Sequence, residues 1–333
     1  MQKSVSILVC FYNAEHKLPK TIEHIQNLDI SGIEGIEVLF IDNKSTDNSQ
    51  VLIHNKFEGF TKFPYAIHYE PIPGVANARK LGLQKAAYDI ILFCDDDNWF
   101  FPDYIKLGLD IMTNDIEIGI LGGQGILTAD VEIPEWVKEK QIHLACGPQA
   151  EQTGLVRGKR NIMYGAGMFM RKDLYFELVA KGFKIMNLSR TGKKLTTGED
   201  DELCFAMHIA GYKVWYDERL QFYHFATADR LSKDYFTRLQ KGGYQSSYIT
   251  RFYLRYLNGY KPQVTKYFWL KEFLYSVKDL AKGLFVNPTK LGIKRNFDFS
   301  MYLLRERGKY NENVRKVLKI CENLDNSPKN IIE

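Results

Sequence analysis

The stretch from Tyr88 to Trp99, YDIILFCDDDNW, constrains the fold of this chain more than any other. Its apolar run, Ile90 to Phe93, is too short for a helix before three carboxylates follow, and it predicts a strand buried on both faces. Asp95, Asp96 and Asp97 then lie at the carboxyl end of that strand, where open α/β sheets bind their ligands.

Three adjacent carboxylates repel one another, so the cluster needs a cation, hydrogen bonds or free water around it. Two interpretations follow. In the first, one or two of the carboxylates bind a divalent cation that bridges the protein and a phosphorylated substrate, and hard oxygen ligands favour Mn²⁺ or Mg²⁺. In the second, the acids form a loop that caps a helix beginning near Asp103.

Strands alternate with helices along the first hundred residues, which predicts an α/β fold with a parallel sheet and right-handed crossovers. The expected strands span residues 5–11, 36–41, 67–69 and 90–93, and the expected helices span 18–28 and 75–87. Polar residues follow successive strand ends: Asn13 and Glu15, then Asp42, then the three aspartates. This recurrence predicts a nucleotide site at one edge of the sheet. No GxGxxG or GxxxxGK[ST] loop occurs, which disfavours the usual dinucleotide fold and a P-loop.

Composition fits a globular protein of 333 residues with an uneven charge distribution. Residues 1–229 carry 24 Lys and Arg against 31 Asp and Glu, whereas residues 230–333 carry 21 against 9, so a basic tail follows an acidic body. The five cysteines are scattered and contain no CxxC pair, which indicates free thiols in a reducing compartment. No signal peptide or membrane-spanning run occurs, and a cytoplasmic location is expected.

A second acidic run, Glu199 to Glu202, opens a predicted helix that continues to Ala210. Two acids would satisfy the positive end of a helix dipole, and four exceed that need. The run therefore predicts a second acidic site. Further upstream, Gly165, Ala166 and Gly167 predict a tight turn where the backbone can approach a substrate.

These motifs together resemble family 2 glycosyltransferases with the GT-A fold. The resemblance rests on SILVCFYNAE, FIDNKSTDNS, PGVANARKLGLQKAAYDIILFCDDD, GAGMFMRKDL, GEDDELCFAMHIAGYKVWYD and FYHF, in this order, and covers roughly residues 3–230. Members of the family transfer a sugar from a nucleotide-diphosphate donor to an acceptor hydroxyl, with inversion at the anomeric carbon. The fold expected from the resemblance is an α/β GT-A fold, with a mixed, mostly parallel sheet, flanking helices and a C-terminal helical extension.

The resemblance also implies roles for individual residues. Asp42 would contact the base or ribose of the donor, Arg79 a donor phosphate, and Asp95 and Asp97 would be the ends of a DxD motif. Asp200 is the candidate general base, and Asp201 is the alternative because the extra acid leaves the register open. The expected sets are Phe11, Asn13, Glu15, Asp42, Arg79, Asp95 and Asp96 for the donor, Asp97 and His224 for the metal, and Gly165, Ala166, Gly167, Glu199 and Arg190 on the acceptor side.

Three of these residues also fit an ordinary structural role without any ligand. Asp42 also fits an ordinary turn, Arg79 a surface position on a helix, and His224 a buried core histidine. The expected geometry places Asp42 and Asp97 at the same sheet edge and Asp200 across a cleft from them.

The expected domains are a catalytic domain at residues 1–230 and a basic, mainly helical extension at residues 231–333. Within the extension, residues 264–284 alternate apolar residues with lysines at helical spacing. This pattern fits a helix on an anionic membrane surface, and it fits equally a helix docked on the catalytic domain with its lysines in water. No nucleic-acid motif occurs, so nucleic acid is not an expected partner. The sequence leaves the oligomeric state open.

The expected function is therefore a metal-dependent inverting glycosyltransferase that uses Mn²⁺ or Mg²⁺ and a nucleotide-sugar, with a UDP-sugar favoured by the resemblance. The acceptor would be a glycan or a lipid-linked sugar in the synthesis of a surface polysaccharide. The alternative is a catalytically silent protein of the same fold that binds a sugar nucleotide or glycan. A nucleotidyltransferase is disfavoured, because FYNAEHK after the first strand is not a triphosphate-binding loop.

Overall fold

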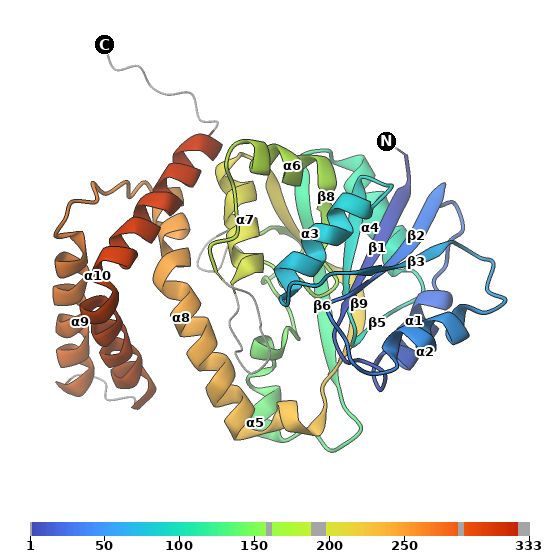
Figure 1. The fold of residues 1–333 in the computed structure, drawn as a ribbon, viewed down its shortest axis with the longest axis horizontal. Coiled ribbons are helices and arrows are strands. Elements are labelled where there is room, and N and C mark those ends of the chain that lie inside the picture. Colours follow the sequence, from blue (N-terminus) through green and yellow to red (C-terminus); the bar gives the residue numbers. More distant parts are fainter. Residues whose placement is uncertain (1, 158–161, 188–197, 286–289, 326–333) are drawn as a thin grey trace, which may run out of the picture.

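The computed structural model describes residues 2–157, 162–187, 198–285 and 290–325. A mixed, mostly parallel sheet carries helices on both faces, and three long helices lie to one side of it (Figure 1). The predicted α/β class with a helical C-terminal part is confirmed.

The sheet follows the strand order β3, β2, β1, β4, β8, β6, β9, β5 across the described residues, and β7 pairs with β9. Its strands are β1 (Ser4–Phe11), β2 (Gly35–Asp42), β3 (Tyr65–Tyr69), β4 (Ile90–Asp95), β5 (Asn98–Phe100), β6 (Ile118–Thr128), β7 (Gly154–Leu155), β8 (Phe169–Arg171) and β9 (Lys213–Phe225). The four strands β3, β2, β1 and β4 are parallel, as expected. Beyond β4 the pairing is mixed, since β8 runs antiparallel to both β4 and β6. The resemblance implied a mixed sheet, but β5 to β9 were not among the strands expected from the sequence.

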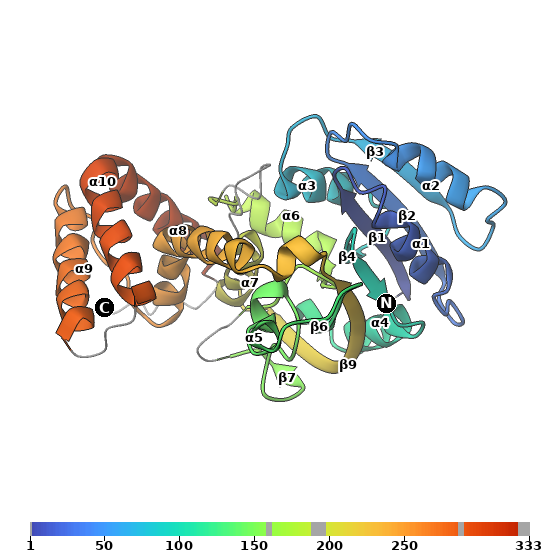
Figure 2. The ribbon, with the colours of Figure 1, turned by 90° about the horizontal axis from the view of Figure 1, so that it is seen from below.

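Helices cover both faces of the sheet because its strands are apolar on both sides. The helices are α1 (Leu18–Gln26), α2 (Ser49–Phe57), α3 (Val75–Lys85), α4 (Tyr104–Asn114), α5 (Glu135–Lys138), α6 (Lys172–Ala180) and α7 (Glu199–Ile209), with the 3-10 helices η1 (Gln141–Leu144) and η2 (Ala228–Leu231). In β1, Ile7 and Val9 belong to a core shared with α1, α2 and α4, whereas Leu8 belongs to a core shared with α3, α6 and α7. Figure 2 shows α1 and α3 on opposite sides of β1. This alternation makes β1 a central strand.

The C-terminal part consists of α8 (Lys233–Leu257), α9 (Phe268–Phe285) and α10 (Lys290–Leu324). Helix α8 packs along α7, and the rings of Phe205 and Tyr253 stack with centroids 6.3 Å apart. The buried apolar side chains of α7, of the C-terminal half of α8 and of α10 belong to one continuous core. The predicted division at residue 230 falls inside η2 and stays a prediction.

A buried carboxylate holds α8, α9 and α10 together. Glu272 of α9 pairs with Arg251 at 2.8 Å and with Arg255 at 3.0 Å, both from α8. The guanidinium of Arg251 also donates to the Tyr310 hydroxyl of α10 at 2.6 Å. Within the residues that the structure describes, no helix has the length and apolar character that crossing a membrane requires.

We expect Glu272→Gln to lower the free energy of unfolding by about 2 kcal/mol, because two arginine side chains lose their buried counter-ion. The estimate is reduced from that of a fully buried pair, since the arginine side chains are 26% and 37% exposed. Chemical denaturation would measure the change. Glu312→Gln removes an exposed partner of Lys316 on α10 and is the matched control, with a change within about 0.5 kcal/mol. Equal stabilities for the two variants would contradict the importance of the Glu272 network.

Candidate active site

The site lies at the edge of the sheet where the parallel strands end. Asp42, the last residue of β2, is opposite Phe11 of β1, and Asp95, the last residue of β4, is opposite Cys10 of the same strand. The two acids therefore follow strands that flank β1. The chain turns back after Asp97 into β5, so that all these acids gather at one edge, as expected from the sequence.

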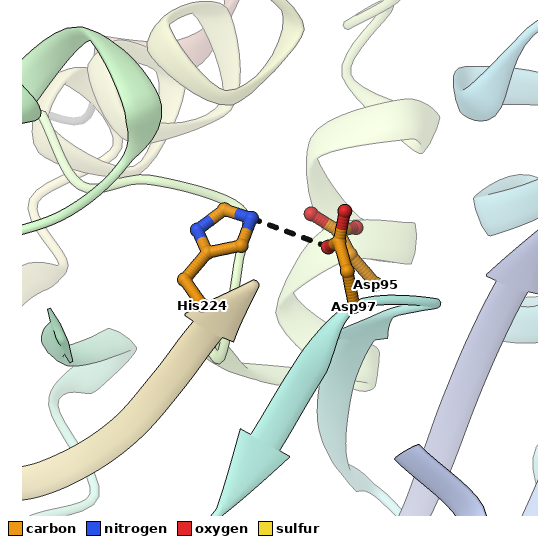
Figure 3. Close-up of side chains that lie close together, drawn as sticks. All are labelled: Asp95, Asp97 and His224. Atoms are coloured by element: carbon orange, nitrogen blue, oxygen red, sulfur yellow. Dashed lines mark ion pairs between the residues drawn. The ribbon is translucent and has the colours of Figure 1, made fainter. Parts of the chain in front are cut away.

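Asp95, Asp97 and His224 form the group on which the site is centred (Figure 3). One potential ligand atom from each lies within 4.8 Å of the others. His224 reaches this position because β5 pairs antiparallel with β9 and sets Asn98 opposite His224. Its Nε2 lies 3.2 Å from Asp97 Oδ1, and both side chains are buried. His224 is thus a buried residue that faces an acid, and its role as a metal ligand stays a prediction.

Three cationic side chains surround the Asp97 carboxylate. Arg230 of η2 donates to Oδ2 at 2.7 Å, and Lys17 lies 3.9 Å from the same oxygen. Burial alone raises the pKa of Asp97, but Arg230, His224 and Lys17 outweigh it and hold the pKa well below its usual value. For His224, burial lowers the pKa, and the Asp97 carboxylate reverses this and raises it to about 10. The Asp97 carboxyl is therefore ionised at neutral pH.

Asp96 has a different environment from its two neighbours. Its carboxylate pairs with Lys17, and the Thr21 hydroxyl of α1 donates to its backbone carbonyl at 2.8 Å. Burial lowers the pKa of Lys17, but the carboxylates of Asp96 and Asp97 more than compensate and raise it. Asp96 thereby fastens the acidic loop to α1. Its expected contact with the donor stays a prediction.

Arg79 of α3 connects the acids of β4 with those of α7. Its guanidinium lies 3.5 Å from Asp95 Oδ1, 3.1 Å from Glu199 Oε1, and within hydrogen-bonding distance of Asp200 Oδ1. The guanidinium also stacks over the Phe93 ring at 5.0 Å. The side chain is buried rather than on the surface. Asp200 is therefore brought next to Asp95 through a single side chain.

The turn at Gly165 fits tightly against Asp200. The Gly165 N–H donates to Asp200 Oδ2 at 2.9 Å. A Cβ atom at residue 165 would lie 2.4 Å from Asp200 Oδ1 and 2.5 Å from an Arg79 nitrogen, so only glycine fits without displacing them. Gly167 has φ +67°, and Ala166 between the two glycines is buried. The tight turn is present, and its contact with an acceptor stays a prediction.

The remaining donor-side residues shape the loops beside Asp42. Phe11 and Asp42 are buried, and Asp42 accepts hydrogen bonds from Ser45 N–H at 2.8 Å and from the Gln50 side chain. The side chains of Asn13 and Glu15 accept from the backbone N–H groups of Thr46 and Asn48, at 2.7 and 3.0 Å. These bonds join the loop after β1 to the loop after β2. Whether the same residues contact a donor stays a prediction, and Arg190 lies outside the described residues.

The four acids of α7 have different environments, which the sequence alone did not distinguish. Glu199 and Asp200 pair with Arg79. Glu202 is fully buried and accepts from the N–H groups of Met186 and Asn187 at 2.8 and 2.7 Å, and from the Tyr253 hydroxyl of α8 at 3.3 Å. Asp201 is half-buried. One acid is therefore structural, and the pair facing Arg79 belongs to the site.

Sequence reasoning missed Lys17 and Arg230. They lie 79 and 133 residues from the acids that they contact. No spacing rule connects residues so far apart. The nearest signal was the presence of basic residues shortly after Asn13 and after His224, and this is too common to single them out.

The profile of Glycosyl transferase family 2 matches residues 6–178, just over half of the chain, and the chain belongs to this family. An uncharacterized glycosyltransferase of Haemophilus influenzae is 33% identical over 109 residues, which cover 32% of this chain and 42% of that protein. GalNAc(5)-diNAcBac-PP-undecaprenol beta-1,3-glucosyltransferase of Campylobacter jejuni is 26% identical over 94 residues, covering 28% and 29%. The chain thus matches less than half the length of these relatives.

A solved structure, S. aureus TarS 1-349 in complex with UDP-GlcNAc, superimposes with a TM-score of 0.55. It is 14% identical and covers 96% of this chain and 91% of TarS 1-349. At this identity the likeness shows the fold alone: the sheet and its flanking helices form a GT-A fold, and the likeness extends over the helical C-terminal part.

Buried Glu202 provides a pH-dependent test of the α7 geometry. Burial raises its pKa from 4.5 to about 7, against the lowering effect of its N–H donors. A carboxyl whose pKa is raised in the folded state stabilises the fold below about pH 4.5, and this contribution is lost as the pH rises through 7. The free energy of unfolding should therefore fall by about 3 kcal/mol through this group between pH 4.5 and 8.

Urea titrations at several pH values, for the parent and for Glu202→Gln, would measure this loss. The variant should lack this part of the decline, whatever its stability at a single pH. Parallel pH profiles for the two proteins would contradict the raised pKa. Glu312→Gln, which changes an exposed glutamate, is expected to follow the parent profile.

Proposed function

We propose that the protein is a metal-dependent inverting glycosyltransferase that moves a sugar from a nucleotide-diphosphate donor to an acceptor hydroxyl. The observation that carries the proposal is the contact of one guanidinium, that of Arg79, with Asp95 on one side and with Asp200 on the other. A sugar-nucleotide-binding protein needs the first acid. Only a transferase also needs the second, beside the place where the donor's sugar would lie.

The residues of the Asp95, Asp97 and His224 group fit Mn²⁺ or Mg²⁺. Two carboxylates and one imidazole offer ligand atoms that such ions accept. His224 would hold such an ion through Nε2, which lies 3.2 Å from Asp97 Oδ1, and it would do so as the neutral imidazole. A bound ion would supply positive charge that stabilises the departing diphosphate.

Asp200 is the proposed general base. One of its oxygens is held by Arg79 and the other by the Gly165 N–H, so the carboxylate is fixed in orientation. Each carboxylate oxygen has a second lone pair, and these lone pairs can accept the proton of the acceptor hydroxyl as its oxygen attacks the anomeric carbon. A carboxylate is a weak base for an alcohol, so this fixed position must provide much of the rate. Asp201, the next residue of α7, is the alternative candidate.

The substrates are proposed by analogy with relatives. TarS has been crystallised with UDP-GlcNAc, and the C. jejuni relative is named for a glucosyl transfer to an undecaprenol-linked glycan. We propose a UDP-sugar donor, and a glycan or lipid-linked acceptor in the synthesis of a surface polysaccharide. Buried Asp42, at the end of β2, would lie on the nucleoside side of the donor.

The test is release of nucleoside diphosphate from a panel of sugar nucleotides, with Mn²⁺, with Mg²⁺ and with EDTA. Hydrolysis of one donor should require the metal, and Asp200→Asn should slow it about 100-fold or more, as expected for loss of a general base. Asp234→Asn, an acid-to-amide change at an exposed ion pair on α8, is the matched control and should leave the rate unchanged.

Two results would count against this assignment of roles. If Asp201→Asn strongly lowers the rate of donor hydrolysis while Asp200→Asn keeps the parent rate, then Asp201 is the base instead of Asp200. Absence of turnover with every donor, also after addition of lipid-linked and glycan acceptors, would favour the alternative of a binding protein without catalysis.

We further propose that α9 lies on an anionic membrane surface, at the inner face of the membrane. Its buried side carries Phe268, Glu272 and Ser276. The opposite side exposes a row of apolar and basic side chains around a shallow hollow of about 510 Å³: Tyr267, Leu270, Lys271, Leu274, Tyr275 and Lys278. Exposed apolar residues flanked by lysines suit the boundary between lipid headgroups and acyl chains. Such a contact would bring the site to a lipid-linked acceptor.

Flotation with liposomes that contain anionic lipid would test this surface. The parent should float with anionic vesicles and less so at high salt, because salt screens the lysines. Leu274→Asp should reduce the floating fraction several-fold, since it places a charge in the centre of the apolar row. Ile116→Asp changes an equally exposed apolar residue far from α9 in the chain and should float like the parent. Flotation unaffected by Leu274→Asp would exclude α9 as the contact.

A further inference from the structure

Arg230 lies beside the group of possible metal ligands and pairs with one of them, Asp97. It belongs to η2, which follows β9 and His224 directly, and its side chain is largely buried. Its guanidinium donates to Asp97 Oδ2 at 2.7 Å and to the carbonyl of Phe225 at 3.4 Å. A full positive charge therefore lies against an oxygen of the residue that is the leading candidate for metal ligation.

The position of Arg230 is fixed from several sides. Its guanidinium lies 5.9 Å from the centre of the Tyr235 ring, and the backbone N–H of Phe225 donates to the Asp97 carbonyl at 3.0 Å. The segment that carries Arg230 and the loop that carries Asp97 are thus tied together by backbone and side chain. These contacts hold the guanidinium beside Asp97.

We propose that Arg230 opposes the binding of a divalent cation at Asp97, and that a nucleoside diphosphate in the same site relieves this opposition. Arg230 opposes the cation because of its charge. An ion bound by Asp97 would share this carboxylate with a buried guanidinium, and like charges repel strongly where water is scarce. The relief by a diphosphate rests on the proposed function, which places a diphosphate beside the ion.

Arg230 has an unused donor that a diphosphate could satisfy. Its Nε is buried and has no hydrogen-bond partner among the described residues. Two phosphate groups offer strong acceptors for a guanidinium, which binds them in a bidentate way. When a diphosphate enters, Arg230 can pair with it as well as with Asp97. The cation and Arg230 then no longer compete for a single carboxylate. Metal and diphosphate then strengthen each other's binding, and this coupling is reciprocal.

The coupling differs from the usual effect of a metal that simply bridges protein and substrate. In that case removal of a neighbouring arginine would leave the affinity for the metal alone unchanged, or would weaken it if the arginine orients Asp97. If Arg230 opposes the cation, its removal strengthens the binding of the metal alone. The sign of the change therefore distinguishes the two.

The experiment is calorimetric titration of Mn²⁺ into the full chain, with and without saturating UDP, at neutral pH. Arg230→Gln should bind Mn²⁺ alone about tenfold more tightly than the parent does. Arg230→Lys keeps the charge and should resemble the parent. In the parent, UDP should strengthen Mn²⁺ binding markedly, and this gain should shrink in Arg230→Gln.

Arg238→Gln is the matched control. Arg238 flanks the same Tyr235 ring at 5.7 Å, and it pairs with the exposed Asp234 instead of with the acidic cluster. Its removal tests whether any lost positive charge near this ring strengthens metal binding, and it should leave the affinity for Mn²⁺ unchanged within about twofold. Circular dichroism would confirm that each variant is folded.

Unchanged or weaker Mn²⁺ binding in Arg230→Gln would overturn the inference, as would an equal gain in Arg238→Gln. Should Arg230→Gln fail to fold, Arg230→Met takes its place in the same titration, and a parent whose Mn²⁺ affinity does not rise with UDP also overturns the inference. The proposed function fails separately. A chain that binds neither UDP nor a sugar nucleotide under any condition would refute that function, whereas tight Mn²⁺ binding independent of UDP would refute only the role of Arg230.

Discussion

The ion pairs of Arg79 are the interactions on which the rest of the site depends. They neutralise carboxylates from the end of β4 and from the start of α7, which come from parts of the chain more than a hundred residues apart. Without this cation, Asp95, Glu199 and Asp200 would face one another in a partly buried space, and their repulsion would push the two elements apart. The Phe93 ring beneath the guanidinium and the absent side chain at Gly165 leave it room in only one place.

The same principle explains how three consecutive aspartates are tolerated at the end of a buried strand. Each has its own basic partner: Arg79 for Asp95, Lys17 for Asp96 and Arg230 for Asp97. The three cations come from α3, from the residue before α1 and from η2, so the acidic loop is tied to three elements at once. The acids are thus candidate binding groups and also the point at which α3, α1 and η2 are joined to the loop after β4.

Much of the fold could be predicted because its signals are local. A buried parallel strand such as β4 is a continuous apolar run, and the polar residues after it mark the edge of the sheet. The strands of the mixed half were not predicted, and β8 has only three residues and is specified by its neighbours β4 and β6. The site shows the same division. The acids could be predicted from their residue type and their position after strands. Lys17 and Arg230 could not, because only the folded chain brings them to these acids. The sequence also could not separate the roles of Glu199 and Glu202, which belong to the same acidic run.

The packing of α7 on α8 has a consequence for orientation. Helix α7 carries Asp200 at its first turn and shares a continuous core with α8 and α10, while Glu272 ties α9 to α8. These contacts leave little freedom between the outer face of α9 and the acids at the sheet edge. The C-terminal helices therefore connect the two: if α9 is held on a surface, its position also sets the distance and tilt of the carboxyl ends of the strands relative to that surface.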